Sequence, residues 1–401
     1  MQSTKLSASY LLACVLPLFL FTWFAEPYAS QMDFWLAWLV AMLLVSLPVL
    51  FAEIGLARRS GQSPLLAMPV LTRESDSSMA WRGYGWLAQL TALSLAALVI
   101  ASIGVHGQAL FAMVGVVLPT FVVGALLMTV VLIISTLGSG LIKPMLLLAL
   151  LAVLATIGIH LADGFELTNM QMTAFSLAEW ARAVALALLC FAVGGGVYWW
   201  ELSQTNLNQT NLNQAQPNQV NQSAQSQSSA SRQVLPILAV QVVVGLVAMV
   251  LVASKEATLS MTLMLMSTDT TLVQGAKMGS TLASGLLVMA GVSLAIALVS
   301  MTMIQVKERL GLVKSMLMLL PALVLVVLPV YVLWGLTVML SIISVLVLSV
   351  FVGWQMKISH LRKSLNFSSE INYNLWRVAI RIFVPLALLV AMVGWVQIWL
   401  G

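Results

Sequence analysis

The sequence predicts an all-α polytopic membrane protein. Hydrophobic residues make up 61% of its 401 positions, charged residues make up only 8%, and the mean hydropathy is +1.02. Soluble domains do not have this balance, whereas each helix that crosses a bilayer needs about 20 apolar residues. We expect about 11 transmembrane spans and no soluble domain. In order they are 9–25, 34–57, 84–104, 117–137, 141–161, 181–200, 233–254, 279–304, 313–328, 333–356 and 375–399.

The basic residues support this span count and indicate an orientation. With a cytoplasmic N-terminus, all but three of the 18 lysines and arginines fall on the inner side, as the positive-inside rule requires. Arg182, Lys255 and Lys277 are the exceptions. The net charge of +5 therefore reflects topology, and we expect no nucleic-acid partner. We expect a multi-pass protein of a bacterial-type inner (plasma) membrane. The residues on the inner side are Lys5, Arg58, Arg59, Arg73, Arg82, Lys143, Arg232, Lys307, Arg309, Lys314, Lys357, Arg362, Lys363, Arg377 and Arg381.

One segment is not typical of a membrane helix. Residues 203–232 are almost all Gln, Asn, Ser and Thr, with a tandem TNLNQ repeat at 205–209 and 210–214. Such a segment cannot bury enough apolar area to offset its chain entropy, so we expect a disordered cytoplasmic linker. It divides the chain into 1–202, which holds spans one to six, and 233–401, which holds spans seven to eleven.

The loop 58–82 carries four arginines. One interpretation is a contact or gate surface on the cytoplasmic side. The other is ordinary positive-inside charge, and the sequence favours this second interpretation. The three histidines, His106, His160 and His360, lie near span ends without metal-ligand spacing, and we assign them no role.

Span six contains three consecutive glycines, Gly194, Gly195 and Gly196. Glycine costs roughly 1 kcal/mol in a helix interior relative to alanine, so the triplet weakens the helix. One interpretation is a helix that breaks at mid-depth and forms the binding site of a secondary transporter. The other is a close contact between two helices. The triplet alone favours neither.

Five segments, in order, resemble the neurotransmitter:sodium symporter family, whose bacterial members have the leucine-transporter fold. They are Leu47–Gly61 in span two, Gly140–Pro144 at the start of span five, Trp180–Tyr198 in span six, Ala290–Ala297 in span eight and Trp376–Arg381 in span eleven. The resemblance covers nearly all of the chain and fits the span count.

The resemblance implies a 5+5 inverted repeat, made of spans one to five and six to ten, plus one extra helix. It implies that spans one and six are broken around a central site. It also implies uptake of an amino acid or amine coupled to sodium. The substrate-binding residues that it implies are Val15, Leu16, Val99, Ala192, Val193, Gly194, Gly195 and Gly196, together with Ser293.

A pocket of this composition is apolar. Recognition would fall to backbone amides at the half-helix N-termini, which suit a carboxylate. Gly195 stands where the family has an aromatic residue, which enlarges the pocket and favours a bulkier solute. Val99 replaces a substrate-facing tyrosine, and Ala25 replaces the family's gating arginine.

The candidate cation ligands also depart from the family pattern. Sodium needs about five or six oxygen ligands. Thr22 replaces an asparagine, and Cys190 replaces a threonine. Pro17 removes one helical hydrogen bond and frees the carbonyl of Ala13. Sodium is the candidate coupling ion, and no other cofactor or metal is expected. The ion-binding candidates are Ala13, Thr22, Cys190, Ala290 and Ser293, although a serine in a membrane helix commonly bonds back to its own backbone.

Glu53 is a carboxyl group well inside span two. Ionisable groups in membranes mark transport pathways or buried networks. The family resemblance implies a structural role, in which Glu53 holds loose backbone donors of the broken spans, and we favour this role. The alternative is a proton-coupling group that replaces sodium.

The sequence therefore favours a secondary transporter of a small amino acid or related solute, coupled to sodium or protons. The alternative is a relative with the same fold that no longer transports and acts as a membrane binding or scaffold subunit. We expect no enzyme, because no arrangement of nucleophile and base and no nucleotide-binding loop is present. The expected partners are a small-molecule substrate and the lipid bilayer.

Overall fold

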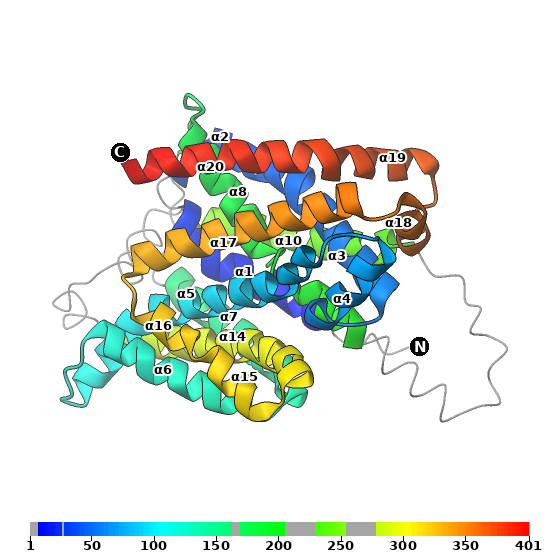
Figure 1. Ribbon diagram of the computed structural model, residues 1–401. Helices are drawn as coiled ribbons and strands as arrows, with labels where there is room; N and C mark the ends of the chain where they lie inside the picture. The colour runs from blue at the N-terminus through cyan, green and yellow to red at the C-terminus, as the bar shows by residue number, and fades with distance from the viewer. Residues whose placement is uncertain (1–6, 26–27, 163–168, 205–228, 254–277, 401) are drawn as a thin grey trace, which may run out of the picture.

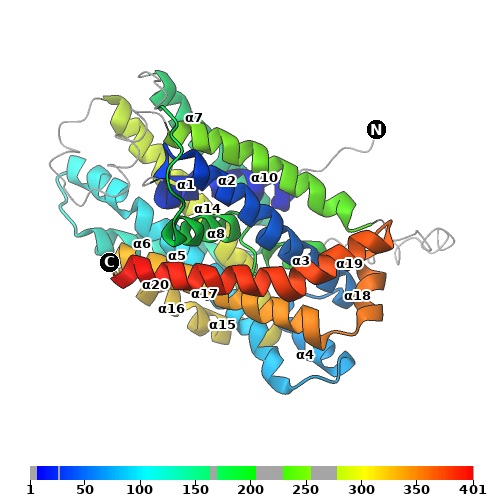
Figure 2. The ribbon, with the colours of Figure 1, turned by 90° about the horizontal axis from the view of Figure 1, so that it is seen from above.

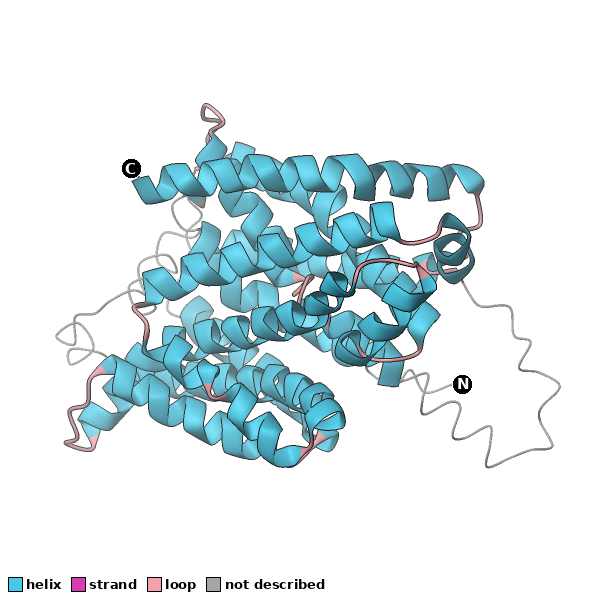
Figure 3. Ribbon diagram, in the orientation of Figure 1, coloured by secondary structure: helices cyan, strands magenta, loops and turns pink. Residues whose placement is uncertain are grey.

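The computed structural model is a bundle of helices, most of which run lengthwise through the molecule (Figures 1 and 3). It describes residues 7–25, 28–162, 169–204, 229–253 and 278–400. Within these ranges the only pairing of extended backbone is an isolated bridge between Gln31 and Gln171. The predicted all-α class is confirmed.

Two sequence predictions concern residues that the description does not cover. Most of the predicted linker, 205–228, lies outside the described residues, as do Lys255 and Lys277. The division of the chain at 203–232 therefore stays a prediction.

The first half of the chain contains the spans that precede the glycine triplet. The elements α2, η2 and α3 run on as one apolar helix, Met32–Ser60, in which η2 is a π-helical turn. The elements are α1 (Ala8–Ala25), α2 (Met32–Ala41), η2 (Met42–Ser46), α3 (Leu47–Ser60), α4 (Pro64–Glu74), η3 (Met79–Arg82), α5 (Gly83–Met113), α6 (Thr120–Ser135), η4 (Ser139–Leu141), α7 (Ile142–Ala162) and α8 (Leu177–Cys190).

The second half begins with a short helix at 197–204, which follows α8 after a break. The last span is one long helix, Glu370–Trp399, in which η8 is a second π-helical turn. The remaining elements are α10 (Ser231–Val252), α14 (Met278–Leu310), α15 (Leu312–Leu319), α16 (Pro321–Val327), α17 (Val330–Val350), η7 (Phe351–Gln355), α18 (Ile358–Leu365), α19 (Glu370–Val378), η8 (Ala379–Phe383) and α20 (Val384–Leu400).

The helices account for all eleven predicted spans. Seven of those described are long and apolar enough to cross a membrane by length and composition. Three shorter apolar helices, Ala8–Phe21, Thr120–Ser135 and Leu312–Val327, add spans one, four and nine. The broken segment formed by α8 and 197–204 is span six. The chain is a multi-pass membrane protein.

Span six lies in the interior of the bundle. Every residue of α8 from Ala183 to Cys190 is buried, whereas α10 and α20 expose large apolar side chains at the periphery, as lipid-facing helices do (Figure 2). Helix α8 packs against α1, α2, α17 and α20, so four other spans surround it.

The expected break in span one is not present. Helix α1 is continuous from Ala8 to Ala25 and contains Pro17 in its interior. A proline removes a single helical hydrogen bond, and here no glycine stands beside it to loosen the backbone further. The bulky side chains of Val15, Phe19 and Phe21 are buried and fill the space that an unwound chain would need.

Residues 58–82 include α4 and η3 and lie beside the helix 197–204, whose Trp199 donates to the carbonyl of Gln62 at 2.8 Å. At the end of α4, Glu74 accepts a hydrogen bond from Arg59 at 3.0 Å. Asp76 pairs with Lys357 at 2.9 Å, just before α18, and this contact lowers the pKa of Asp76. The loop thus has contacts to several helices within the molecule, and both interpretations of its arginines stay predictions.

Two of the histidines also have structural contacts. The Nδ1 atom of His360, on α18, lies 3.8 Å from Oε2 of Glu74. The Nδ1 atom of His106, on α5, lies 3.2 Å from the hydroxyl of Ser284 on α14. Both side chains connect helices that are distant in the sequence, so no local pattern predicts their partners.

Candidate functional site

The glycine triplet lies in a true break of span six. Helix α8 begins with a capping box between Ser176 and Glu179 and ends at Cys190. Residues 191–196 are not helical, and the helix resumes at 197. Three backbone φ angles in the break are positive: +47° at Ala192, +82° at Gly194 and +64° at Gly196. The structure confirms that span six is broken, and a binding site at the break stays a prediction. The triplet also packs closely against neighbouring helices, as the other interpretation expected.

The surroundings require glycine at two of the three positions. A Cβ atom on Gly194 would lie 2.9 Å from a methyl group of Val345, and one on Gly196 would lie 2.6 Å from the ring of Pro64. Gly195 has an ordinary φ angle, and its Cβ would come no closer than 3.2 Å to a neighbouring atom. Positive φ and close contact therefore act together at Gly194 and Gly196.

Side chains from three other spans bond to the loosened backbone of the break. The Gly194 N–H donates to Oε1 of Glu53 on α3 at 2.8 Å, and the hydroxyl of Ser344 on α17 donates to the Gly194 carbonyl at 2.6 Å. The side-chain amide of Gln241 on α10 donates to the carbonyl of Cys190. Buried backbone groups need such partners because no water competes in hydrocarbon.

The hydroxyl of Ser46 adds a similar contact one turn before the break. It belongs to the π-helical turn η2 and donates to the carbonyl of Ala187 at 2.9 Å. The π-helical turn and the helix that follows it therefore both hold span six, the turn through Ser46 and α3 through Glu53.

Glu53 lies where its predicted structural role requires, bonded to the backbone of the broken span six. Its side chain is fully buried, and one carboxylate oxygen accepts the Gly194 N–H. The backbone of Gly196 interacts with the same carboxylate, so Glu53 contacts the break at two of its glycines. Two buried tyrosines, Tyr84 and Tyr198, are close enough for their hydroxyls to interact electrostatically with the carboxylate. Glu53 thus binds the backbone of the break from α3.

The predicted substrate-binding residues of span six are buried and apolar, as expected. Ala192 is 5% exposed and Val193 is 1% exposed. Val15 and Leu16, on α1, are completely buried. These residues are therefore closed to solvent in this conformation.

Helix α5 faces the break at residues that the sequence analysis missed. The Cβ atom that Gly195 lacks would lie 3.7 Å from Cβ of Ala92, and that of Gly196 would lie 3.8 Å from Cβ of Ala88. The predicted Val99 lies about two helical turns farther along α5. The signal that could have identified this face is the run of alanines at i, i+4 spacing, since small residues permit close helix packing.

The predicted cation ligands lie on three different elements. Ala13 lies in the unbroken helix α1, and Thr22 lies near its end, where its side chain is outside the described residues. Ala290 and Ser293 lie on α14, which packs mainly against α5 and α7. The carbonyl of Cys190 accepts the amide of Gln241, a contact that the sequence analysis did not predict. Among the described residues, no group of His, Cys, Asp or Glu could hold a metal ion.

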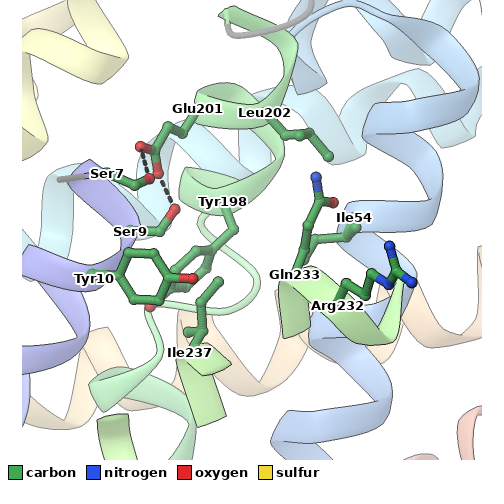
Figure 4. Close-up of a pocket in the computed structure, with 10 residues that line it drawn as sticks. All are labelled: Ser7, Ser9, Tyr10, Ile54, Tyr198, Glu201, Leu202, Arg232, Gln233 and Ile237. Carbon is green, nitrogen blue, oxygen red and sulfur yellow. Dashed lines mark hydrogen bonds between the residues drawn. The ribbon is translucent and has the colours of Figure 1, made fainter. Parts of the chain in front are cut away.

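Span six is also joined to span one at the N-terminal end of the molecule. The hydroxyls of Ser7 and Ser9 donate to the two carboxylate oxygens of Glu201, and the backbone N–H groups of Ala8 and Ser9 bond to it as well (Figure 4). The carboxylate therefore caps the first turn of α1, where unpaired amides and the helix dipole favour a negative charge.

A cavity of about 180 Å³ lies beside this contact. Apolar side chains make most of its wall, and the polar groups come from spans one, six and seven (Figure 4). The hydroxyl of Tyr198, which is 2% exposed, has no hydrogen-bond partner among the described residues. The lining residues are Ser7, Ser9, Tyr10, Ile54, Tyr198, Glu201, Leu202, Arg232, Gln233 and Ile237.

We predict that alanine is tolerated differently across the triplet. Gly194→Ala and Gly196→Ala should each lower the free energy of unfolding by at least 1 kcal/mol, because a side chain at positive φ is strained and meets a close neighbour. Gly195→Ala is the matched control and should have a smaller effect. Thermal unfolding of the purified variants measures how much each substitution destabilises the protein. An equal loss at all three positions would contradict the role of positive φ.

We also predict that Glu201→Gln loosens the start of α1. The glutamine has the same size but lacks the charge and one of the two acceptors, so the expected loss is about 1–2 kcal/mol. Hydrogen exchange at residues 8–12 measures the effect locally. The control is Glu370→Gln, which removes an exposed ion pair with Arg362 and should change little. Unchanged exchange at the start of α1 would contradict the capping role.

The comparisons with known proteins identify the fold. No family model matches the chain, and no curated protein matches it by sequence. Among the solved structures, the chain is similar to MhsT in complex with L-phenylalanine, a neurotransmitter:sodium symporter, with a TM-score of 0.67. The two are 12% identical, and the similarity covers 98% of each chain. The chain therefore adopts the leucine-transporter fold, as its family resemblance implied.

Proposed function

We propose that the chain is a secondary transporter of the neurotransmitter:sodium symporter type, which moves an apolar amino acid or related solute by alternating access. The observation that carries this proposal is the broken span six, whose backbone is held by Glu53, Ser344 and Gln241. Discontinuous helices at mid-depth are where transporters of this architecture bind their substrates.

The composition of the break supports an apolar solute with a carboxylate. The wall consists of Val15, Leu16, Val193 and the alanines of α5, all buried. The Gly194 amide is already engaged by Glu53. The amides of the first turn at 197–199 are thus the ones suited to a substrate carboxylate, because the first turn of a helix leaves its amides without helical partners. The phenylalanine bound to MhsT is a solute of this class.

The ion-binding candidates favour a proton over sodium as the coupling ion. Sodium would need several freed carbonyls, but α1 is continuous and the carbonyl of Cys190 accepts an amide donor. Glu53 is the ionisable group bonded to the break, through the backbone of Gly194 and Gly196. Proton uptake there would change a side chain that holds the backbone of the binding site, which is what coupling requires.

We expect a ligand to stabilise the purified protein. A solute at a hundred times its Kd should add about 2.7 kcal/mol to the free energy of unfolding. The measurement is thermal unfolding with a panel of amino acids, in sodium and in potassium at two pH values. A shift with one apolar amino acid supports the carrier, and the dependence on sodium or pH identifies the coupling ion. No shift with any amino acid would favour the alternative of a non-transporting scaffold subunit.

We predict that Glu53→Gln separates the structural role from coupling. The glutamine oxygen can still accept the Gly194 N–H, so the protein should fold and the ligand should still raise its melting temperature. Accumulation of solute against a gradient in proteoliposomes should be lost, along with its dependence on a pH difference. Glu370→Gln, at an exposed site, should retain both. Unchanged accumulation in Glu53→Gln would show that protons do not couple through this residue.

A further inference from the structure

Arg182 lies at the opposite end of span six from Glu201, within a group of aromatic rings. Its guanidinium carbon is 5.0 Å from the ring centroid of Trp334, the fifth residue of α17, and 5.7 Å from that of Tyr28, which lies between α1 and α2. Cations at this distance over a ring face are attracted by its quadrupole. One side chain of α8 thus holds two other segments by the same type of contact.

The rings around Arg182 extend this contact to two further helices. Phe24, near the end of α1, lies 5.3 Å from Trp334, and Trp395 of α20 lies 4.8 Å from the same ring in an edge-on arrangement. Trp334 therefore contacts the guanidinium and two aromatic residues at once. We call Phe24, Tyr28, Arg182, Trp334 and Trp395 the aromatic–arginine cluster.

The cluster lies near the end of α8 that is farther from the break. Arg182 is half-buried, whereas every residue of α8 after it, down to Cys190, is buried. Phe24 and Ala25, at the end of α1, are also completely buried. Arg182 marks the boundary between solvent and the closed interior, about two helical turns before the helix ends.

The charge of Arg182 is unusual for its place in the sequence. It is one of three basic residues that do not follow the positive-inside pattern of the other lysines and arginines. Two of these residues lie outside the described part of the chain. A cation at this end has no role in setting topology, so a local function explains it better.

We propose that Arg182, held between Tyr28 and Trp334, is the gate residue that closes the pathway to the break from the end opposite the N-terminus. The inference rests on the proposed transport function. The cation–π contacts of one guanidinium join three segments at this level, and the flat group can slide along a ring face. Opening then includes separation of Arg182 from the rings of Tyr28 and Trp334, with Phe24 and Trp395 moving apart beside them.

The test uses the thiol of Cys190 as a reporter of access. Cys190 is 1% exposed, lies at the end of α8 just before the break, and is one of only two cysteines. In a Cys14→Ser background it is the only thiol. A membrane-impermeant maleimide is added to right-side-out vesicles, and the rate of labelling is measured without any solute.

Arg182→Gln and Trp334→Leu should each raise the labelling rate about tenfold, which corresponds to the loss of roughly one desolvated cation–π contact. The double variant should label much less than about a hundredfold faster, because the two single variants share the Arg182–Trp334 contact and their effects do not multiply. The matched control is Arg381→Gln, which removes a similar contact with Trp354, at 5.5 Å, near the other end of the bundle. It should label at the original rate.

Three results would overturn the proposal. The first is an unchanged rate in Arg182→Gln, and the second is an equal increase in Arg381→Gln, which would indicate general loosening. The third is labelling of Cys190 that is as fast in Arg182→Lys as in Arg182→Gln. The lysine keeps the positive charge, so it should retain part of the contact with the rings and label more slowly. If a variant unfolds, as judged by its elution and melting profile, Tyr28→Leu replaces it with the same expectation.

The labelling assay does not depend on a solute, so it separates this inference from the proposed function. Faster labelling in the cluster variants, without any amino acid that stabilises the protein, would confirm the gate and reject the carrier. An amino acid that stabilises the protein, with labelling unchanged in every cluster variant, would support the carrier and reject Arg182 as its gate.

Discussion

The need to satisfy a broken backbone inside an apolar bundle is the constraint on which the rest of this structure depends. Between Cys190 and residue 197 the helical hydrogen-bond ladder stops, and an unpaired backbone group in hydrocarbon costs several kcal/mol. Glu53, Ser344 and Gln241 provide the missing partners from three different spans. Each must lie at the right height in the bundle, so the break fixes the relative positions of α3, α10 and α17.

The same constraint explains why span one is continuous where span six is broken. Two breaks facing each other would double the number of backbone groups to be satisfied, and α1 contains few polar residues near its centre. Its middle is filled by Val15, Leu16 and Phe19, all buried against neighbouring helices. A continuous helix pairs its own backbone, so α1 needs no polar partners from other spans. In the proposed transporter, a site lined by such residues would recognise shape and backbone-directed groups rather than side-chain charge.

The sequence was sufficient for those features that leave a local pattern. Hydropathy identified all the spans, because each apolar run is long, and the glycine triplet identified the break, because Gly194 and Gly196 adopt positive φ angles. The partners of the break could not be predicted, since Gln241 and Ser344 lie far from it in the sequence and look like ordinary polar residues in helices. The continuity of α1 was missed because Pro17 alone does not decide whether a helix breaks; the packing of its neighbours does.

The break divides span six into two arms that are held at their far ends by different contacts. Arg182, on α8, is held by the rings of Tyr28 and Trp334, and Glu201, on the helix 197–204, is held by the first turn of α1. Six non-helical residues separate the arms, so a change of φ and ψ at the glycines can move one arm while the other keeps its contacts. Alternating access needs two closures that open separately. A rigid helix through the bundle would couple them mechanically, whereas a glycine break uncouples them. In the proposed transporter, this gives the costly triplet a role in alternating access.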